Sequence, residues 1–275
     1  MMKAIYQTVN LTEHLSSVPE MEPLSSLLFE LSNEYRMTIL TKLREEPMRL
    51  SRLSEKMGLA VQETSRHLTR LSDACLIAKD PDGQFSLTPY GAHAVMLLPG
   101  FEFLAKHGHY FMTHSLSHIP PELFERIGEL SDCMFTNEVM TMFHEGEKLI
   151  RGAKEYILVI SDQILMSAVP LLHQAAERGV QLKVILPEDL NPPTDFEPWR
   201  GSAEFVGRRT IKKVDVFTTV SDKGGLVGFP MWNGVADHVG FVAMDERARR
   251  WCKDLFMVHW EQAKPGVPKG FPPVF

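Results

Sequence analysis

Residues 48–91 read MRLSRLSEKMGLAVQETSRHLTRLSDACLIAKDPDGQFSLTPYG, and this stretch decides the fold of the N-terminal part of the chain. Its apolar spacing predicts a helix, a tight turn, a second helix, and then a short β-hairpin that leads into another helix. Two short helices joined by a glycine-containing turn are typical of the helix-turn-helix, and a hairpin directly after them is typical of its winged variant. We therefore expect a domain that binds double-stranded DNA.

The first helix of the pair is expected to start at a Ser51 cap and to bury Leu53, Ser54 and Met57. Gly58 then supplies the left-handed backbone that the turn requires.

The second helix is expected to begin near Val61 and to bury Thr64, Leu68, Leu71 and Cys75, which are spaced three or four residues apart. Its opposite face is polar and can reach base edges or phosphates when the helix lies in a major groove. The residues expected to contact DNA from this face are Gln62, Glu63, Ser65, Arg66, His67, Thr69 and Arg70.

Residues 76–79 and 84–87 are expected to pair across an Asp-Pro-Asp-Gly turn, with Lys79 and Gln84 against the sugar-phosphate backbone. The domain as a whole is not basic, so a local positive stripe has to supply the phosphate affinity, and a dimer would double it. The alternative is a small helical domain whose polar face meets only water. The further residues expected to contact phosphates are Arg36, Lys42, Arg44 and Arg52.

Three segments of this region, 31–43 (LSNEYRMTILTKL), 62–71 (QETSRHLTRL) and 87–91 (LTPYG), resemble ArsR-like winged-helix regulators. With 117–130 (SHIPPELFERIGEL) and 214–229 (VDVFTTVSDKGGLVGF), and with WCKDLF at 251–256 and Trp260, the chain resembles archaeal FilR-type regulators, the methanogenesis regulatory protein family. The likeness covers nearly all of the chain after about Pro23. It implies transcriptional regulation, linked in that group to methanogenesis genes, and identifies no ligand.

The composition fits a globular chain of 275 residues that is 44% hydrophobic and carries a net charge of −6. No apolar run approaches the ~20 residues needed to cross a bilayer, and the first residues lack the apolar core of a signal peptide. Its three cysteines, Cys75, Cys133 and Cys252, are widely separated and odd in number, which argues against a disulfide scaffold. We expect a cytoplasmic protein with no membrane partner.

The apolar helix after the wing is expected to break at Pro99-Gly100 and to pair two protomers into a homodimer. The alternative is that it docks onto its own domain. The expected organisation is a lead-in at 1–21, a winged helix-turn-helix domain at 22–90, a helical connector at 91–118, an α/β effector domain at 119–264 and a tail at 265–275.

The C-terminal part alternates strand and helix. Strands at 155–161 and 181–186 joined by a helix predict a βαβ unit with a parallel pair, and Asn137 and Asp245 are expected to cap helices. The fold class is thus an α+β winged helix-turn-helix domain followed by an α/β domain with a mixed sheet. The element order is similar to one half of the phospholipase D-like fold. Further strands are expected at 203–206, 214–220, 226–229 and 239–244, with a hairpin turn at Gly224-Gly225.

Enzymes of the phospholipase D type need a His-x-Lys pair, yet none of the eleven histidines has a lysine two residues later. The sequence also lacks a Gly-x-Ser-x-Gly elbow, a phosphate-binding glycine loop and a His-Glu-x-x-His motif. We therefore predict that the chain is not an enzyme, has no cofactor, and senses an unidentified small-molecule effector.

Residues 229–238 place Trp232, Asn233, Asp237 and His238 after a strand end, where ligands of open α/β sheets bind. These four are the candidate ligand-binding residues. The alternative is an ordinary surface loop with an anchoring tryptophan.

Two side-chain groups leave a metal- or redox-responsive regulator as an alternative function. His114 and His118, in a run with His107 and His109, are four residues apart and would share a helical face suited to a metal. No cysteine or acidic ligand lies in that run, which favours plain polar residues and no metal. Cys133 and Cys252 are candidates for oxidation, although lone cysteines usually pack as small apolar residues. A further alternative is an enzyme or nucleotide-binding protein whose winged domain contacts proteins.

Overall fold

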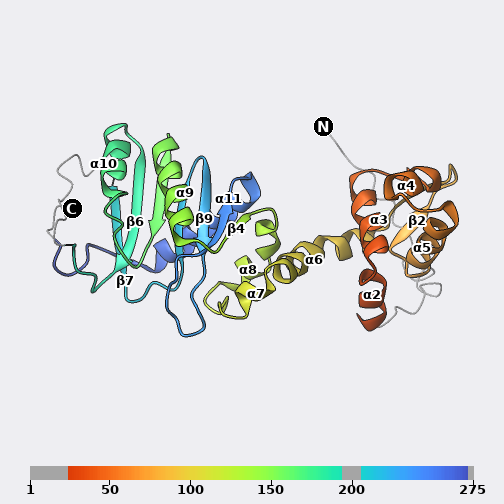
Figure 1. Cartoon of the computed structure of the whole chain (residues 1–275), viewed down its shortest axis with the longest axis horizontal. Coiled ribbons are helices and arrows are strands. Elements are labelled where there is room, and N and C mark those ends of the chain that lie inside the picture. The colour runs from red at the N-terminus through yellow and green to blue at the C-terminus, as the bar shows by residue number, and fades with distance from the viewer. Residues whose placement is uncertain (1–23, 194–205, 272–275) are drawn as a thin grey trace, which may run out of the picture. The chain divides into compact units, whose positions relative to one another are not determined.

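The computed structural model describes residues 24–193 and 206–271, and the chain divides into two compact units, 1–96 and 97–275 (Figure 1). Predictions for the lead-in at 1–21, for residues 203–205 of an expected strand and for 272–275 of the tail lie outside the described residues. Each unit is described by itself.

In the described residues of the first unit, helices α2 to α5 pack with a three-stranded antiparallel sheet of order β1-β3-β2. The predicted order of helix, turn, helix and hairpin is confirmed. Its core comes from apolar residues spaced along these elements, among them Ile39, Leu40, Leu53, Leu68 and Leu71. The elements are α2 (Leu24–Leu31), α3 (Glu34–Glu45), β1 (Met48–Arg49), α4 (Leu50–Met57), α5 (Val61–Asp73), β2 (Ile77–Lys79) and β3 (Gln84–Leu87).

The start of α4 differs from the prediction. Ser51 lies inside the first turn, because the helix begins at Leu50, with Arg49 as a cap residue that makes no side-chain hydrogen bond. Arg49 also pairs with β3, so the chain passes from strand to helix without room for a separate capping residue. The turn after α4 is as predicted: Gly58 has a φ of 64°, in the left-handed region.

Cys75 also differs from the prediction, since it is half-buried and has a φ of 58°. It follows the end of α5, where the backbone N–H of Leu76 donates to the carbonyl of Leu71 over 2.9 Å. This left-handed residue ends the helix and turns Leu76 into the core, where it is fully buried.

Helix α6 (Pro89–Lys106) contains Pro99 within its length, so the predicted break at Pro99-Gly100 was wrong. A proline inside a helix can be tolerated when neighbouring groups support the distorted turn. Here the Ser131 hydroxyl donates to the Pro99 carbonyl over 2.9 Å. A Cβ added to Gly128 would lie 2.6 Å from the backbone nitrogen of Gly100, so the two segments pack backbone to backbone.

The second unit is an α/β domain with one mixed eight-stranded sheet of order β11-β7-β6-β5-β8-β9-β10-β4. Strands β5, β6 and β7 are parallel to one another and the other neighbours are antiparallel, which confirms the predicted βαβ unit. Its elements are α7 (Gly108–Phe111), α8 (Pro121–Phe124), η2 (Ile127–Leu130), β4 (Met134–Thr136), α9 (Val139–Gly152), β5 (Tyr156–Ile160), α10 (Val169–Glu177), β6 (Gln181–Pro187), β7 (Val206–Ile211), β8 (Phe217–Ser221), β9 (Gly224–Gly228), β10 (Gly240–Ala243), α11 (Glu246–Gln262) and β11 (Lys264–Pro265).

Helices cover both faces of this sheet, with α9 and α10 on one face and α11 on the other (Figure 1). Alternating residues of β5 show the two layers: Ile157 packs with α10 residues such as Ala175, and Leu158 packs with α11 residues such as Trp251. Within the described ranges, no helix is long and apolar enough to span a membrane.

Two helix starts in this unit had been predicted to be capped. Asp245 does cap α11, since its Oδ1 accepts hydrogen bonds from the backbone N–H groups of Arg247 and Ala248 at 2.9 and 3.0 Å. Asn137 does not cap α9, whose cap residue is Glu138 without a side-chain hydrogen bond.

The predicted turn at Gly224-Gly225 was wrong, because both glycines belong to β9 and the turn residues are Asp222 and Lys223. The absence of side chains at these glycines allows neighbouring segments to pack closely against β9. A Cβ at Gly225 would lie 3.1 Å from the Cβ of Cys252 in α11. This strand therefore lets a helix approach the sheet closely.

Candidate functional site

The polar face of α5 is the surface that the sequence predicted to meet DNA. The predicted contact residues Gln62, Glu63, Arg66, Thr69 and Arg70 are exposed. The other two, Ser65 and His67, are half-buried, and the His67 ring lies 5.5 Å from the Tyr35 ring. The buried stripe of Thr64, Leu68 and Leu71 holds the helix against the core, so its polar side faces outward.

Arg70 is tied to another helix of the same unit. Its Nε donates to Glu30 Oε2 of α2 over 3.1 Å, and its Nη2 contacts Glu30 Oε1. The guanidinium also lies over the Phe29 ring, 5.2 Å from its centroid. The hydrogen bond from Arg70 holds the pKa of Glu30 below its usual range, so this carboxylate is charged at neutral pH. Contact between Arg70 and DNA therefore requires competition with Glu30.

Arg36 was expected to contact phosphates, and the structure contradicts this. Its side chain is buried and donates to the backbone carbonyls of Glu30 and Phe29, each over 2.7 Å. It also pairs with the Glu30 carboxylate at 3.0 Å. A buried guanidinium with these partners joins α2 to α3 and is not available to a ligand.

The remaining basic residues near α5 lie at the surface. Arg52 is half-exposed and pairs with Glu46 at 2.7 Å, while Lys79 of β2 extends over the Phe85 ring. Gln84 is half-buried at the start of β3.

Among the described residues Arg66 forms no ion pair, so it is the α5 cation most accessible to an anionic partner. Arg44 is exposed and Lys42 is half-buried.

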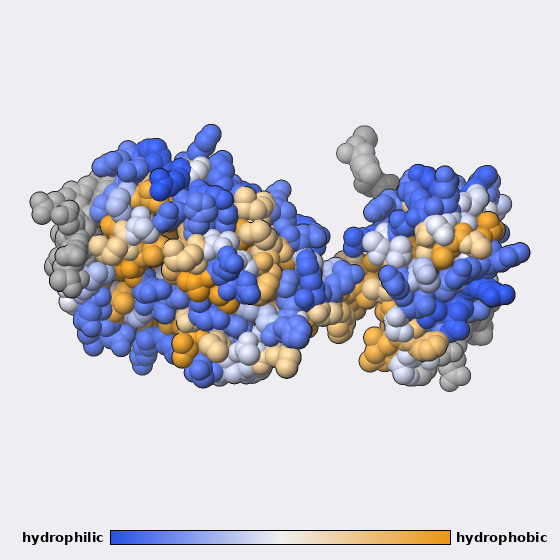
Figure 2. Space-filling model, viewed as in Figure 1, coloured by the Kyte–Doolittle hydropathy of each residue, from blue (hydrophilic) through white to orange (hydrophobic). Residues whose placement is uncertain are grey.

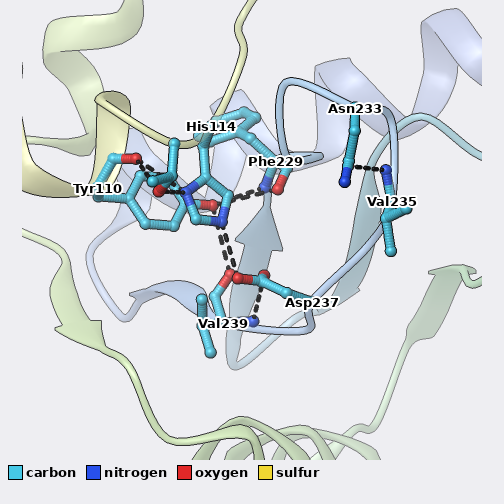
Figure 3. A network of polar contacts seen from close by, with 8 residues as sticks. Tyr110, His114, Phe229, Asn233, Val235, Asp237 and Val239 are labelled. Atoms are coloured by element: carbon cyan, nitrogen blue, oxygen red, sulfur yellow. Dashed lines mark hydrogen bonds and ion pairs between the residues drawn. The ribbon is translucent and has the colours of Figure 1, made fainter.

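The four candidate ligand-binding residues of the loop after β9 do not form one site. Trp232 is 66% exposed, and the Asn233 side chain accepts a hydrogen bond from Val235 N over 3.0 Å within the loop (Figure 3). Asp237 instead faces His114, with Oδ2 2.8 Å from the imidazole Nε2. Asn233 and Asp237 therefore order the loop, while the Trp232 side chain faces solvent.

A buried polar network joins α7 to this loop (Figure 3). The Tyr110 hydroxyl accepts a hydrogen bond from Phe229 N over 2.9 Å, and its ring stacks on His114 with centroids 3.7 Å apart. Burial raises the pKa of Tyr110, so the phenol stays neutral. The loop is thus fastened to Tyr110 of α7 at Phe229, and to His114, just after α7, at Asp237.

The network also explains why His114 and His118 do not form the expected pair on one helical face. Helix α7 ends at Phe111, before either histidine. His114 is buried against Tyr110, whereas His118 is half-exposed with Nδ1 3.9 Å from Asp215 Oδ2. Among the described residues, no three His, Cys, Asp or Glu side chains gather as metal ligands would.

The cysteines weighed as redox sensors are buried. Burial raises the pKa of Cys133 to about 12 and that of Cys252 well above its usual value. Both thiols are therefore protonated at neutral pH, and a protonated, buried thiol reacts slowly with oxidants. This geometry favours the packing interpretation over redox sensing.

His238 differs from its loop neighbours, because it lines a cavity of about 160 Å³ between the sheet, α9 and α10. Its φ of 58° lies in the left-handed region, an unusual conformation for a side chain of this size. The imidazole Nε2 lies 3.0 Å from both Asp162 Oδ1 and Gln163 Nε2.

Most of the residues that line this cavity were not singled out from the sequence. They include Arg208, His173 and Gly146, which come from three separate elements. The sequence offered only two local indications of these residues. Gly146 is a small residue on the buried face of α9, and Arg208 is a charged residue within a strand.

Comparisons with known proteins give fold-level likenesses only. No family model and no curated protein matches the sequence. The chain is similar to TrmBL2, an archaeal chromatin protein with a novel mode of DNA binding, at 15% identity and a TM-score of 0.40, over 88% of this chain and 100% of that one. It is also similar to NucT from Helicobacter pylori, at 11% identity and a TM-score of 0.35, over 49% of this chain and 97% of that one.

A third similar structure is Nuc from Salmonella typhimurium, a phospholipase D family member, at 14% identity and a TM-score of 0.33. The match covers 45% of this chain and 89% of the Nuc chain. The prediction that the chain is not an enzyme was wrong. NucT and a phospholipase D family member are among the structures that resemble it, so enzymatic activity is not excluded. The absence of familiar motifs was too narrow a ground for that prediction.

Proposed function

We propose that this chain is a sequence-specific DNA-binding transcriptional regulator of the FilR type. The observation that carries the proposal is the exposed polar face of α5, which belongs to a helix-turn-helix followed directly by a β-hairpin. This element order is the one with which winged helix proteins read duplex DNA.

In the proposed complex α5 enters the major groove. Gln62 and Arg66 face base edges, since amide and guanidinium groups match the donor and acceptor patterns of adenine and guanine. Lys79 and Gln84 at the wing and Arg52 in α4 contact phosphates, which position the protein without reading sequence. Glu63, Ser65, His67, Thr69 and Arg70 complete the contact surface.

The proposed regulator acts as a homodimer, so that two α5 helices meet half-sites about one helical turn, roughly 34 Å, apart. The feature that supports dimerisation is the apolar surface of α6, where Met96, Leu97 and Phe101 are 72%, 71% and 66% exposed. In this proposal the α/β unit is the effector domain, and a bound small molecule biases the spacing of the two reading helices.

The test begins with selection of bound sequences from a random duplex library by the full-length protein, followed by fluorescence anisotropy on the enriched duplex. Replacing Arg66 by Ala should weaken binding by about tenfold or more, since a good side-chain–base contact discriminates by ~1–3 kcal/mol. The matched control is Arg250→Ala, an exposed arginine of α11 that pairs with Glu246 at 3.5 Å and lies far along the chain from α5. It should bind as the unchanged protein does.

A second readout separates base reading from phosphate contact. Lys79→Ala should weaken binding to all sequences alike and reduce the slope of affinity against salt by about one charge. The proposal fails if the library yields no enriched sequence and the protein shows no duplex binding at low ionic strength.

A further inference from the structure

We propose that the α/β unit binds a compact, neutral aromatic molecule with one hydrogen-bonding group, such as a phenol, in the cavity between α9, α10 and the sheet. The proposal names the class of small molecule to which the effector of the proposed regulator belongs, and in that respect it rests on the proposed function. Binding itself involves only the second unit and requires no DNA.

The volume of the cavity limits the ligand to about one ring. The cavity measures about 160 Å³, and apolar cavities of roughly 150 Å³ stay free of water and bind benzene. A much larger molecule would have to displace the walls, because protein interiors are closely packed. The site therefore favours a compact ligand over a long chain.

A row of side chains on four neighbouring strands forms the floor of the cavity. Val159 of β5 lies between Val184 of β6 and Thr219 of β8 in the register of the sheet, and Leu226 of β9 follows Thr219. All four line the cavity, and only Thr219 is polar. Figure 2 shows hydrophobic surface on the face of this unit that carries α9 and α10. The body of the ligand therefore meets apolar side chains.

Three aromatic side chains of the lining lie together. The centroid of the His238 ring is 4.9 Å from that of the Phe217 ring and 5.7 Å from that of the Phe143 ring. Aromatic rings attract one another at centroid distances of about 4.5–7 Å, most favourably edge to face or offset. A further ring in the cavity can extend this cluster, which favours an aromatic ligand over a saturated one.

The charged and ionisable side chains of the lining already have partners within the chain. His238 has its carboxylate partner at 3.0 Å, and Glu147 lies 3.7 Å from Arg151 of its own helix. Arg208 and His173 have partners as well. A charged ligand would have to break one of these contacts or stay unpaired against apolar walls, and an unpaired buried charge is strongly unfavourable. The cavity therefore favours a neutral molecule.

The Thr219 hydroxyl is the polar group that a neutral ligand can use. It forms no hydrogen bond within the part of the chain that the structure describes, whereas the hydroxyl of the preceding Thr218 donates to the Leu226 carbonyl over 2.6 Å. A hydroxyl both donates and accepts, so it can bond an O–H or N–H group on a ring. Among apolar neighbours such a bond discriminates against a ligand that lacks the matching group.

The test is an NMR titration of the full-length protein, isotope-labelled at its Ile, Leu and Val methyl groups, with phenol, toluene and benzoate as probes. Phenol and toluene should bind with a Kd of about 1 mM or lower and shift the methyl signals of Val159, Val184 and Leu226. Benzoate should bind about tenfold or more weakly than phenol, because its charge would remain unpaired. The proposal is overturned if neither neutral ring binds in this range, if benzoate binds as tightly as phenol, or if the shifted signals come from outside the lining.

Thr219→Val separates the hydrogen bond from the apolar contact. Valine has nearly the shape of threonine without the hydroxyl, so phenol affinity should fall about threefold or more while toluene affinity stays the same or rises. The matched control is Thr141→Val, which removes a hydroxyl of α9 outside the lining and should change neither affinity. Unchanged phenol binding by Thr219→Val would overturn the choice of a ligand with a hydrogen-bonding group.

A pair of substitutions at Gly146 locates the site. A Cβ there would meet nothing closer than Leu226 Cδ1 at 4.0 Å, so the position opens onto free space. Gly146→Leu should fill the cavity and lower the affinity for phenol and toluene about tenfold or more. Gly146→Ala, which leaves most of the space open, is the control and should bind both rings nearly as before.

Thermal unfolding of both Gly146 variants would show that the unit remains folded. Unchanged binding of the two rings by folded Gly146→Leu would place the ligand elsewhere and overturn the proposal. Because no DNA is present in these measurements, their failure is separate from a failure of the proposed DNA binding.

Discussion

At the scale of single residues, Glu30 holds two arginines that the sequence had assigned to DNA. It pairs with buried Arg36 and with exposed Arg70. The sequence could not reveal this, because Glu30 and Arg70 are forty residues apart and only the packing of α2 brings them together. Sequence periodicity showed which side of α5 faces outward, but long-range pairing decides which of its cations are free.

Glu30→Gln should lower the unfolding free energy of the first unit by about 1–2 kcal/mol at neutral pH, since the buried Arg36 loses its charged partner. The lowered pKa of Glu30 means that its contribution is present above its usual value of 4.5 and is lost as pH falls through the lower, folded-state value. Urea unfolding followed from pH 7 down to about pH 3 should show the difference between the two proteins shrinking. A constant difference would contradict the charge-based account.

The same substitution should also strengthen binding to the enriched duplex. Loss of the carboxylate frees Arg70 and removes a negative charge beside α5, so we expect a several-fold gain in affinity at low salt. Fluorescence anisotropy measures this, and Glu34→Gln, at the exposed start of α3, is the control. Equal affinities for the two variants would mean that Arg70 takes no part in binding.

Tyr110→Phe tests the buried network of the second unit. Removal of the hydroxyl leaves the N–H of Phe229 without the hydrogen bond that now measures 2.9 Å. An unpaired buried donor costs about 1–3 kcal/mol, so the free energy of unfolding, measured by urea denaturation, should fall by that amount. Thr113→Val removes the hydroxyl of an exposed residue nearby, which donates to the Tyr110 carbonyl, and should have a smaller effect.

At the scale of elements, the sequence predicted what depends on local pattern. The helix-turn-helix, the wing, the parallel βαβ unit and the Asp245 cap all follow from periodicity and turn chemistry. The errors lie where tertiary packing overrides a local signal, as at Pro99 and at Gly224-Gly225. The cavity could not be predicted, because its lining comes from elements distant in the sequence.

Two glycines at the start of neighbouring helices should respond in opposite ways to alanine. A Cβ at Gly91 would lie 1.9 Å from the Leu76 carbonyl oxygen, so Gly91→Ala must displace backbone between α6 and β2. Gly108 has nothing within 4 Å of an added Cβ, and Gly108→Ala should be neutral or stabilising by up to about 1 kcal/mol. Thermal unfolding of both variants checks this. A stable Gly91→Ala protein would contradict the close approach.

At the scale of the whole molecule, the apolar surface of α6 bears on the proposed dimer. A contiguous exposed apolar surface on a helix indicates a partner. Leu97→Glu combined with Phe101→Glu should place charges in the interface and produce monomers, as measured by sedimentation velocity. Glu102→Gln, an exposed neighbour on the same helix, should leave the association state unchanged. A protein that is monomeric before substitution would remove the dimer from the proposal.

The eight-stranded sheet of the second unit ends in two very short strands. On one side β4 has three residues, and on the other β11 has two, of which Pro265 carries no N–H to offer to a new strand. Long open rims of unpaired backbone are the places where β-rich proteins recruit copies of themselves into fibrils. Within the described part of the chain, the two outermost strands of this sheet are too short to offer such a rim themselves, so we expect them to recruit further copies poorly even at high concentration.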